Sequence, residues 1–221
     1  MILLPSRGRP SKLARYFEAY HATEAVEPGI VMIEARDEEA YADVALPEGW
    51  RKVTVPQSLV SKKFNDGAFV YAPNESRYFV MADDVVPETK HWDQILVEEA
   101  EDYKIAFGND CINPPPPVGH PCIGGNLVRA LGWLAHPAFG HFYWDNALRD
   151  IALGLGDEFL TYRPDIVMRH LHWTVTGEYD QACRERGDPS DDKRTYQSWK
   201  AGVMAEDIER VKCAFGFYHR A

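Results

Sequence analysis

The sequence lacks several motifs that would identify a well-known kind of site. Its four cysteines show no Cys-x-x-Cys spacing, so neither a zinc knuckle nor a disulfide framework is expected. No G-x-x-x-x-G-K-[ST] or G-x-G-x-x-G stretch occurs, so a P-loop NTPase and a dinucleotide-binding fingerprint are unsupported. No G-x-S-x-G nucleophile elbow is present either.

Long apolar runs are also absent, and basic residues are outnumbered by acidic ones. No run approaches the roughly 20 apolar residues that span a bilayer, and the first four residues are too short for a signal-peptide core. We therefore expect a cytoplasmic protein without a membrane partner. The formal net charge is -10, from 24 Lys+Arg against 34 Asp+Glu, which argues against broad non-specific nucleic-acid binding but leaves a local basic groove open.

The chain has the length and composition of a globular α/β protein. With 221 residues and 45% hydrophobic content it can bury a full core. Strand and helix patterns alternate, which predicts a mainly parallel sheet covered on both faces. The expected strands lie at residues 1–5, 29–35, 51–55, 77–81 and 165–173, and the expected helices at 13–20, 58–64, 90–101, 125–134, 146–155 and 193–217. Four prolines at 114–117 predict an extended connector within residues 113–119.

The apolar run of the fourth strand ends in two adjacent carboxylates, Asp83 and Asp84. Neighbouring carboxylates repel unless a positive group joins them, and a divalent cation that bridges a phosphate is a common solution. In open α/β sheets, ligands sit beyond the carboxyl ends of the strands, which is where this pair falls. A turn or a helix N-cap explains the same two residues.

Two further segments follow strand ends. Pro5, Ser6, Arg7 and Arg9 come directly after the first strand, and guanidinium groups with free backbone N–H groups at such a turn suit a diphosphate. The glycine of this loop has a simpler explanation as the residue that makes the turn. Asp37 ends the second strand, where it could contact a nucleobase or ribose, or cap the next helix.

Polar residues elsewhere carry weaker signals. Lys62 and Asn65 lie on the helix before the fourth strand, where a solvated face is the default and a nucleotide contact the alternative. His170 and His172 are two residues apart, so on a strand both imidazoles point to one face. One could complete a metal shell begun by Asp84, while a pair of satisfied core histidines is the other interpretation.

Asp145 stands among aromatic residues at the start of a predicted helix. Apolar surroundings raise the pKa of a carboxylate and a helix N-terminus lowers it, so the sequence leaves the balance open. The residue could act as a general base or as an N-cap. Trp133, Trp144 and Trp173 could stack on a sugar or a flipped base, or fill the core.

In chain order these segments resemble the motifs of GT-A-fold nucleotide-sugar glycosyltransferases of the broad family 2 type. The order spans about three quarters of the chain. The matching segments are Pro5-Ser6-Arg7-Gly8-Arg9-Pro10, Asp37, Asn65-Asp66-Gly67, Ala82-Asp83-Asp84, Gly124-Gly125, Tyr143-Trp144-Asp145-Asn146 and His170-Leu171-His172.

The resemblance implies a GT-A-type, Rossmann-like mixed sheet with a helical C-terminal tail: a catalytic domain over residues 1–185 and a helical extension over 186–221 packed on it. Asp83 and Asp84 stand for the DxD motif of the family, with Asp84 as the Mn²⁺ or Mg²⁺ ligand and Asp83 nearer the ribose. Ala82 replaces the first acid, which leaves the metal with fewer protein carboxylates. His170 and His172 are the other candidate ligands, and a UDP-sugar is the expected sugar donor.

The same resemblance implies that Asp145 is the base of an inverting transfer, with Gly124, Gly125 and Trp144 around the acceptor or the transferred sugar. A retaining mechanism needs no such base and stays open. Short chains of this appearance resemble phage-encoded transferases, so a modified base in phage DNA and a glycan are both candidate acceptors. Two alternatives from other classes remain: a metal-dependent sugar nucleotidyltransferase and a non-catalytic nucleotide-sugar binding module.

Overall fold

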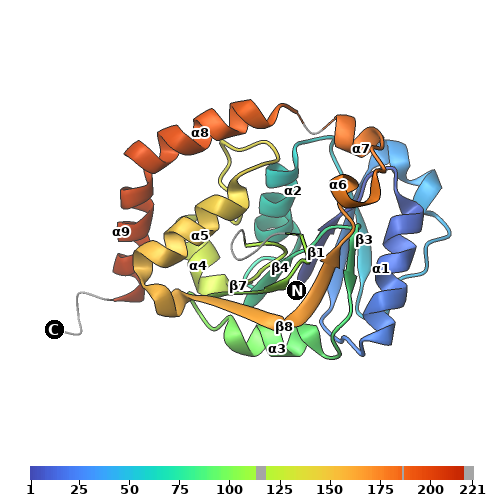
Figure 1. Ribbon diagram of the computed structural model, residues 1–221, viewed down its shortest axis with the longest axis horizontal. Coiled ribbons are helices and arrows are strands. Elements are labelled where there is room, and N and C mark those ends of the chain that lie inside the picture. The colour runs from blue at the N-terminus through green and yellow to red at the C-terminus, as the bar shows by residue number, and fades with distance from the viewer. Residues whose placement is uncertain (113–117, 186, 217–221) are drawn as a thin grey trace.

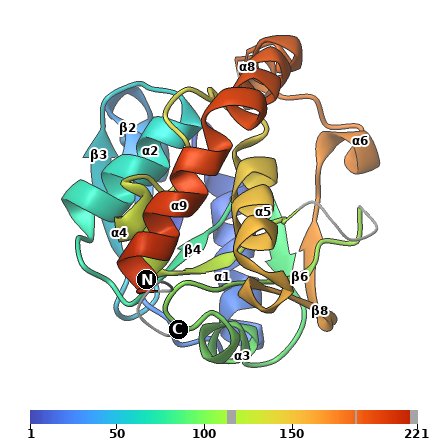
Figure 2. The ribbon, with the colours of Figure 1, turned by 90° about the vertical axis from the view of Figure 1, so that its left-hand side faces the viewer.

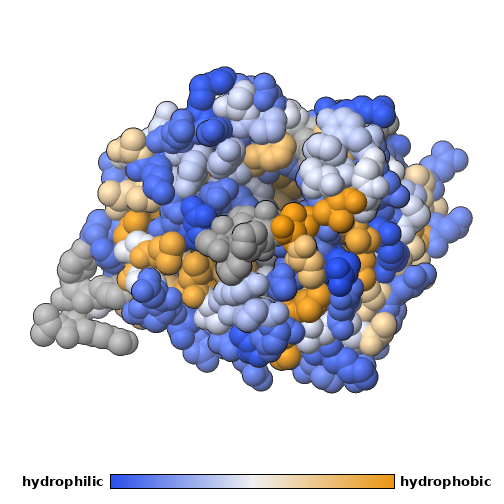
Figure 3. Space-filling view, viewed as in Figure 1, coloured by the Kyte–Doolittle hydropathy of each residue, from blue (hydrophilic) through white to orange (hydrophobic). Residues whose placement is uncertain are grey.

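The structure is a computed structural model that describes residues 1–112, 118–185 and 187–216. The four prolines of the predicted connector lie outside the described residues. Within these ranges, no helix has both the length and the apolar character needed to span a bilayer. The face seen in Figure 3 is mostly hydrophilic, with apolar side chains in several separate groups.

One mixed sheet organises the described residues (Figure 1). Its eight strands run in the order β3-β2-β1-β4-β7-β6-β8-β5. The pairs β1–β2, β2–β3, β1–β4 and β6–β8 are parallel, whereas β7 is antiparallel to β4 and β6, and β5 is antiparallel to β8. The strands are β1 Ile2–Pro5, β2 Gly29–Glu34, β3 Arg51–Val55, β4 Arg77–Val80, β5 Val85–Pro87, β6 Ile105–Asn109, β7 Cys122–Gly124 and β8 Leu160–His170.

Helices cover both faces of this sheet (Figures 1 and 2). Side chains alternate along β1, so Leu3 joins one hydrophobic cluster while Ile2 and Leu4 join the other. The first cluster includes residues of α2, α4, α5, α8 and α9, and the second includes residues of α1 and α3. The helices are α1 Pro10–Ala22, α2 Val60–Asp66, α3 Trp92–Glu99, α4 Gly125–Leu131, α5 Trp144–Leu155, α6 Trp173–Thr176, α7 Gln181–Arg184, α8 Pro189–Gly202 and α9 Met204–Phe215.

The α/β fold class and the first four strands are confirmed, with bounds within one residue of the prediction. The strand predicted at 165–173 is wrong at both ends, because β8 begins at Leu160 and ends at His170. Its pairing with β6 passes from Arg163 directly to Val167, so Pro164, which has no N–H to donate, falls in the irregular step.

The C-terminal tail forms two helices rather than one. α8 ends at Gly202 and α9 begins at Met204, with Val203 between them. α9 packs against α4 and α5, and its Ile208 and Val211 enter the same cluster as Leu148 of α5. The tail is therefore part of the core on this face of the sheet.

Candidate functional site

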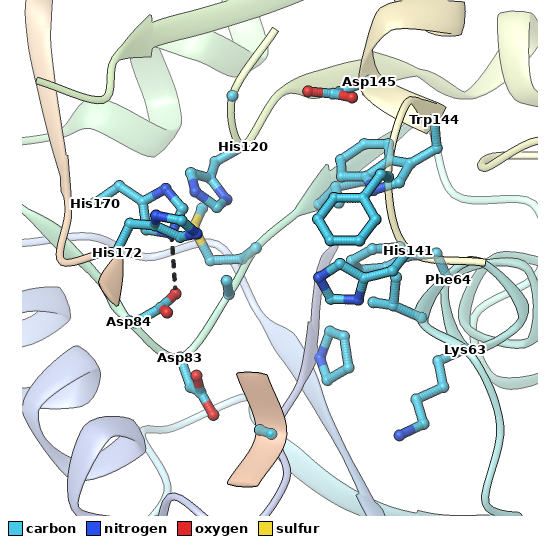
Figure 4. A pocket seen from close by; sticks show the side chains of 18 of the residues that line it. Lys63, Phe64, Asp83, Asp84, His120, His141, Trp144, Asp145, His170 and His172 are labelled. Atoms are coloured by element: carbon cyan, nitrogen blue, oxygen red, sulfur yellow. Dashed lines mark ion pairs between the residues drawn. The ribbon is translucent and has the colours of Figure 1, made fainter. Parts of the chain in front are cut away.

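A cavity of about 650 Å³ opens at the carboxyl ends of β1 and β4. This is the edge of an open α/β sheet where ligands bind. Its described lining comes from segments far apart in the sequence: the loop after β1, the start of α2, the loop after β4, residues around 110 and 120, the loop into α5, the end of β8, residues 182, 183 and 185, and Pro189. Figure 4 draws side chains that line the cavity and labels ten of them.

The carboxylates of Asp83 and Asp84 lie on one side of this cavity, and both residues are buried. Asp83 accepts hydrogen bonds from Ser6 Oγ at 2.6 Å and from Arg9 Nη1 at 3.1 Å. Burial and the negative charge of Asp84 raise the pKa of Asp83. Burial also acts to raise the pKa of Asp84, but the contacts with His170 and Arg9 outweigh it and hold that pKa well below its usual range. The two residues lie in the turn between β4 and β5, as one of the alternatives predicted, and not at a helix N-terminus, where His91 is the N-cap of the next helix. The pair also belongs to a charged network.

Three imidazole rings gather beside Asp84. His170 Nε2 lies 3.3 Å from Asp84 Oδ1, and the His170 ring centroid lies 4.7 Å from that of His120 and 5.2 Å from that of His172. His172 does not share a strand face with His170, because the strand ends there and His172 is the N-cap of α6. Burial and the neighbouring His170 lower the pKa of His120 to about 3, so its ring is neutral at pH 7.

The donor atoms of Asp84 and His170 fit a small divalent cation. Two adjacent ligands of an octahedral cation with bonds of about 2.1 Å stand about 3.0 Å apart, close to the 3.3 Å between Asp84 Oδ1 and His170 Nε2. The described residues contain no group of three or more His, Cys, Asp or Glu side chains placed to hold a metal. These two residues would therefore hold Mn²⁺ or Mg²⁺ only with substrate oxygens and water as further ligands.

The arginines of the loop after β1 pair with carboxylates in this structure. Arg9 Nη2 donates to Asp180 Oδ1 at 2.7 Å, in addition to the contact of its Nη1 with Asp83. Arg7 forms ion pairs with Glu34 and Glu185. We call residues 178–185 the acidic strap, since its carboxylates form ion pairs with the two arginines of the loop after β1.

The strap makes further ion pairs with basic residues outside the first loop. Lys12 Nζ lies 3.2 Å from Asp180 Oδ2, and Arg36 Nη2 lies 3.2 Å from Glu185 Oε2. Burial acts to raise the pKa of Asp180, but its hydrogen bond from Arg9 and other contacts hold the pKa well below its usual range. Sequence reasoning missed the strap because nothing local links residues 178–185 to a loop near the N-terminus.

An aromatic wall, which we define as Phe64, His141, Phe142 and Trp144, lines the cavity. Figure 4 shows Phe64, His141 and Trp144 on the side away from Asp84, and the ring of Phe142 contacts that of His141. The ring centroids of Phe64 and Trp144 lie 5.4 Å apart. Asp145 lies next to this wall in the first turn of α5, where burial raises its pKa. Tyr143 occupies the N-cap position of α5, so the N-cap interpretation of Asp145 is wrong.

Only one of the three candidate stacking tryptophans, Trp144, is among the described lining residues of the cavity. Trp133 is buried in the core cluster that covers the first face of the sheet. Trp173 lies at the start of α6, where its ring contacts those of His172 and Tyr179.

Five other predicted site residues do not appear in the described lining of the cavity. These are Asp37, Lys62, Asn65, Gly124 and Gly125. Exposed Lys62 pairs with Asp66 on its own helix. Asn65 accepts hydrogen bonds from the backbone of Leu134 and Ala135, and its side-chain amide donates to the carbonyl of Ala135.

The other three residues lie in a turn or at a junction between two elements of the fold. Asp37 lies in a 3₁₀ turn after β2. Gly124 and Gly125 join β7 to α4, where a Cβ would meet the backbone of Asp102 at 2.0 Å and of Glu75 at 2.1 Å. Close backbone packing therefore explains both glycines.

Lys63, the neighbour of Lys62, lines the cavity instead. Its Nζ donates to Glu34 Oε1 at 2.6 Å, and both residues are buried. Burial acts to raise the pKa of Glu34, but the hydrogen bond from Lys63 and the charges of Arg7 and Arg36 lower it overall. The end of β2 thus contributes a buried ion pair beside the cavity.

No protein-family model matches the sequence, and no curated protein matches it. Solved structures do match the fold. The 4-diphosphocytidyl-2C-methyl-D-erythritol synthase of Anaerococcus prevotii aligns with a TM-score of 0.54 at 8% identity, over 90% of this chain and 95% of that one. A homologue of Mycobacterium tuberculosis Rv0371c from Mycobacterium sp. strain JC1 aligns with a TM-score of 0.53 at 12% identity, over 84% and 96%.

Residues 1–349 of S. aureus TarS align with a TM-score of 0.52 at 7% identity. That match covers 76% of this chain and 58% of the other. At these identities the likeness concerns the fold. The chain therefore has the GT-A-like, Rossmann-like α/β fold that its sequence motifs predict.

Proposed function

We propose that the chain is a nucleotide-sugar-dependent glycosyltransferase, which moves a sugar from a nucleoside-diphosphate donor to a hydroxyl group. One observation carries the proposal. A buried carboxylate pair with an arginine and an imidazole, at the carboxyl ends of parallel strands, shares one cavity with Asp145, a carboxylate whose pKa burial raises. The first group suits a metal-bound diphosphate, and the second suits a general base.

The diphosphate of a UDP-sugar would bind at the loop after β1. Pro5 and Ser6 belong to this loop, and Arg7 and Arg9 supply guanidinium groups, of which that of Arg9 lies next to Asp83. A Mn²⁺ or Mg²⁺ ion held by Asp84 and His170 would neutralise charge on the departing diphosphate. The sequence assigned a nucleotide contact to Lys62 and Asn65. In this proposal the buried pair of Lys63 and Glu34 lies beside the nucleotide instead.

Asp145 would accept the proton of the attacking hydroxyl group. The hydroxyl oxygen forms a bond to the anomeric carbon while the bond from that carbon to the diphosphate oxygen breaks. The bonding electrons leave with the nucleoside diphosphate, and the proton ends on the Asp145 carboxylate. A raised pKa makes the Asp145 carboxylate a stronger base, and the aromatic wall gives the acceptor an apolar surface on which to stack.

The test is a panel of UDP-, GDP- and TDP-sugars incubated with the protein and Mn²⁺, with release of nucleoside diphosphate as the readout. We expect slow hydrolysis of one donor, because water can replace the acceptor, and we expect EDTA to suppress it. Binding of a nucleotide sugar without turnover, with glycans and hydroxymethylated DNA present as acceptors, would contradict the transferase proposal and leave a binding module.

Nucleotidyl transfer is the second candidate. The fold match to the Anaerococcus prevotii 4-diphosphocytidyl-2C-methyl-D-erythritol synthase favours this candidate. That match covers 90% of this chain and 95% of the synthase. Such an enzyme would use the same arginine loop and aspartates on a nucleoside triphosphate. Release of pyrophosphate from CTP or UTP in the presence of a sugar phosphate, with no diphosphate release from any nucleotide sugar, would favour this candidate over the first.

A further inference from the structure

The loop that leads into α5 is held by the C-terminal tail. Asp192 of α8 accepts three backbone hydrogen bonds from consecutive residues of this loop, from the N–H groups of Gly140, His141 and Phe142, each at 2.8 Å. Asp192 is buried, with 9% of its surface exposed. One carboxylate thus satisfies three neighbouring donors that precede the N-cap of α5.

A second contact from α8 fixes the next residue of the loop. The ring of Tyr196, one helical turn after Asp192, stacks on that of Tyr143 with centroids 5.3 Å apart and an interplanar angle of 23°. Tyr143 has a φ of 66°, a conformation that non-glycine residues adopt only when their surroundings impose it. Tyr196 also donates a hydrogen bond to Asp150 Oδ2 at 2.5 Å, which ties α8 to α5 itself.

The residues placed by these contacts are those on the acceptor side of the cavity. His141 and Phe142 belong to the aromatic wall, and Asp145 follows two residues after Tyr143. The donor side, with Arg9, Asp83 and Asp84, makes no hydrogen bond or ion pair with Asp192 among the described residues. A change at Asp192 therefore acts on one side of the cavity.

We propose that Asp192 is a positioning residue that sets the placement of Asp145 and the aromatic wall. The C-terminal tail thereby holds the acceptor side of the active site in place. This inference rests on the proposed function. Charged hydrogen bonds to backbone N–H groups are among the stronger ones in proteins, and three on one carboxylate restrict the loop to one conformation. Displacement of a catalytic group by about 1 Å can reduce turnover about 10²-fold.

The test compares Asp192→Asn with the matched control Asp191→Asn. Asp191 is the preceding residue of the same helix, and its exposed carboxylate pairs with Arg194. Asp192→Asn keeps the shape of the side chain but presents an amide NH₂ group to backbone donors. Asp192→Ala serves as a second variant, and if it fails to fold the isosteric variant still decides the question.

Three readouts separate positioning from general damage. Amide hydrogen exchange at residues 140–142 should accelerate about 10-fold or more in Asp192→Asn, because the exchange-protecting hydrogen bonds weaken. UDP binding with Mn²⁺, measured by calorimetry, should stay within about 2-fold of wild type, while turnover of the accepted nucleotide sugar falls about 10- to 100-fold. In Asp192→Asn the acid limb of the kcat–pH profile should shift, because the surroundings of the proposed base Asp145 change. Asp191→Asn should match wild type in all three readouts.

Unchanged exchange or unchanged turnover in Asp192→Asn, with an active wild-type protein, would overturn the positioning role. An equal loss of UDP binding and turnover would also overturn it, since the effect would then reach the donor side. If wild type turns over no nucleotide sugar, the proposed function fails and the positioning role falls with it. That failure is distinguishable because the exchange measurement reports on the contact of Asp192 with the loop without any substrate.

Discussion

Lys63 Nζ lies 2.6 Å from Glu34 Oε1, and both side chains are buried where the end of β2 meets α2. Removal of one partner leaves a buried charge poorly compensated, which typically costs about 3–5 kcal/mol. We expect Lys63→Met to lower the free energy of unfolding by about 3 kcal/mol, at the lower end because Arg36 Nε remains 2.9 Å from Glu34. Urea denaturation monitored by tryptophan fluorescence measures this change.

The preceding residue supplies the control. Lys62 forms an exposed ion pair with Asp66 on the same helix, and such pairs contribute about 0.3–0.5 kcal/mol. Lys62→Met should therefore change the free energy of unfolding by no more than about 0.5 kcal/mol. Equal effects of the two substitutions would show that the buried pair does not stabilise the fold in the way described.

Asp84→Asn tests the proposed metal ligand. The substitution removes the negative charge beside His170 Nε2, and a neutral amide oxygen is a weaker ligand for Mn²⁺. We expect the enhancement of UDP binding by Mn²⁺ to fall at least about 10-fold, while binding of UDP alone changes little. Calorimetric titrations with and without Mn²⁺ measure both quantities. An enhancement equal to that of wild type would place the metal elsewhere.

Asp180→Asn tests the acidic strap. Arg9 must exchange its contact with Asp180 for one with the substrate if the diphosphate binds at this loop. Removal of the competing carboxylate should tighten UDP binding about 3- to 10-fold, the amount expected for one charged hydrogen bond in a partly exposed site. Weaker UDP binding in this variant would show that Asp180 supports the binding conformation of Arg9 rather than competing for it.

The junction of α5 and α8 should make stability depend on pH. Burial acts to raise the pKa of Asp150, but hydrogen bonds from Lys200, Tyr196 and Arg149 lower it overall below its ordinary value of 3.8. Because the folded state binds this proton less readily than the unfolded state, the stabilisation is complete above about pH 5 and is lost as the pH falls through the folded pKa. Asp150→Asn should therefore lower Tm at pH 7 and have a much smaller effect near pH 2.

The Tm of Asp150→Asn at the two pH values can also contradict the role of the Asp150 charge. An equal loss of Tm at both pH values would mean that Asp150 stabilises the fold by packing rather than by its charge. Arg194→Gln serves as a control, since it removes an exposed pair with Asp191 on α8 and should leave Tm nearly unchanged at both pH values.

Short-range patterns predicted the part of the site that follows strand ends. Buried strands such as β1 and β4 are apolar runs with clear polar ends, so the positions of Arg9, Asp83 and Asp84 could be read from the sequence. Lys62 and Lys63 lie differently because successive residues of a helix point about 100° apart, so that Lys63 is buried beside the cavity while Lys62 is exposed. α2 begins at Val60 rather than at residue 58.

Contacts between distant segments could not be predicted from one sequence. Asp192 lies about 50 residues from the loop that it holds, and Asp180 lies 171 residues from Arg9. Each acidic residue resembles an ordinary surface carboxylate until the fold is known. His120 gave no signal for the same reason, since its partner His170 lies 50 residues further along the chain.

Turnover by Asp145→Asn, compared with wild type on the nucleotide sugar that wild type accepts, is the most direct test of Asp145 as the general base of sugar transfer. The substitution removes the proposed base but keeps the size of the side chain. We expect release of nucleoside diphosphate to fall about 10²- to 10⁴-fold while UDP binding with Mn²⁺ stays within about 2-fold of wild type. Turnover by Asp145→Asn near the wild-type rate would contradict that role.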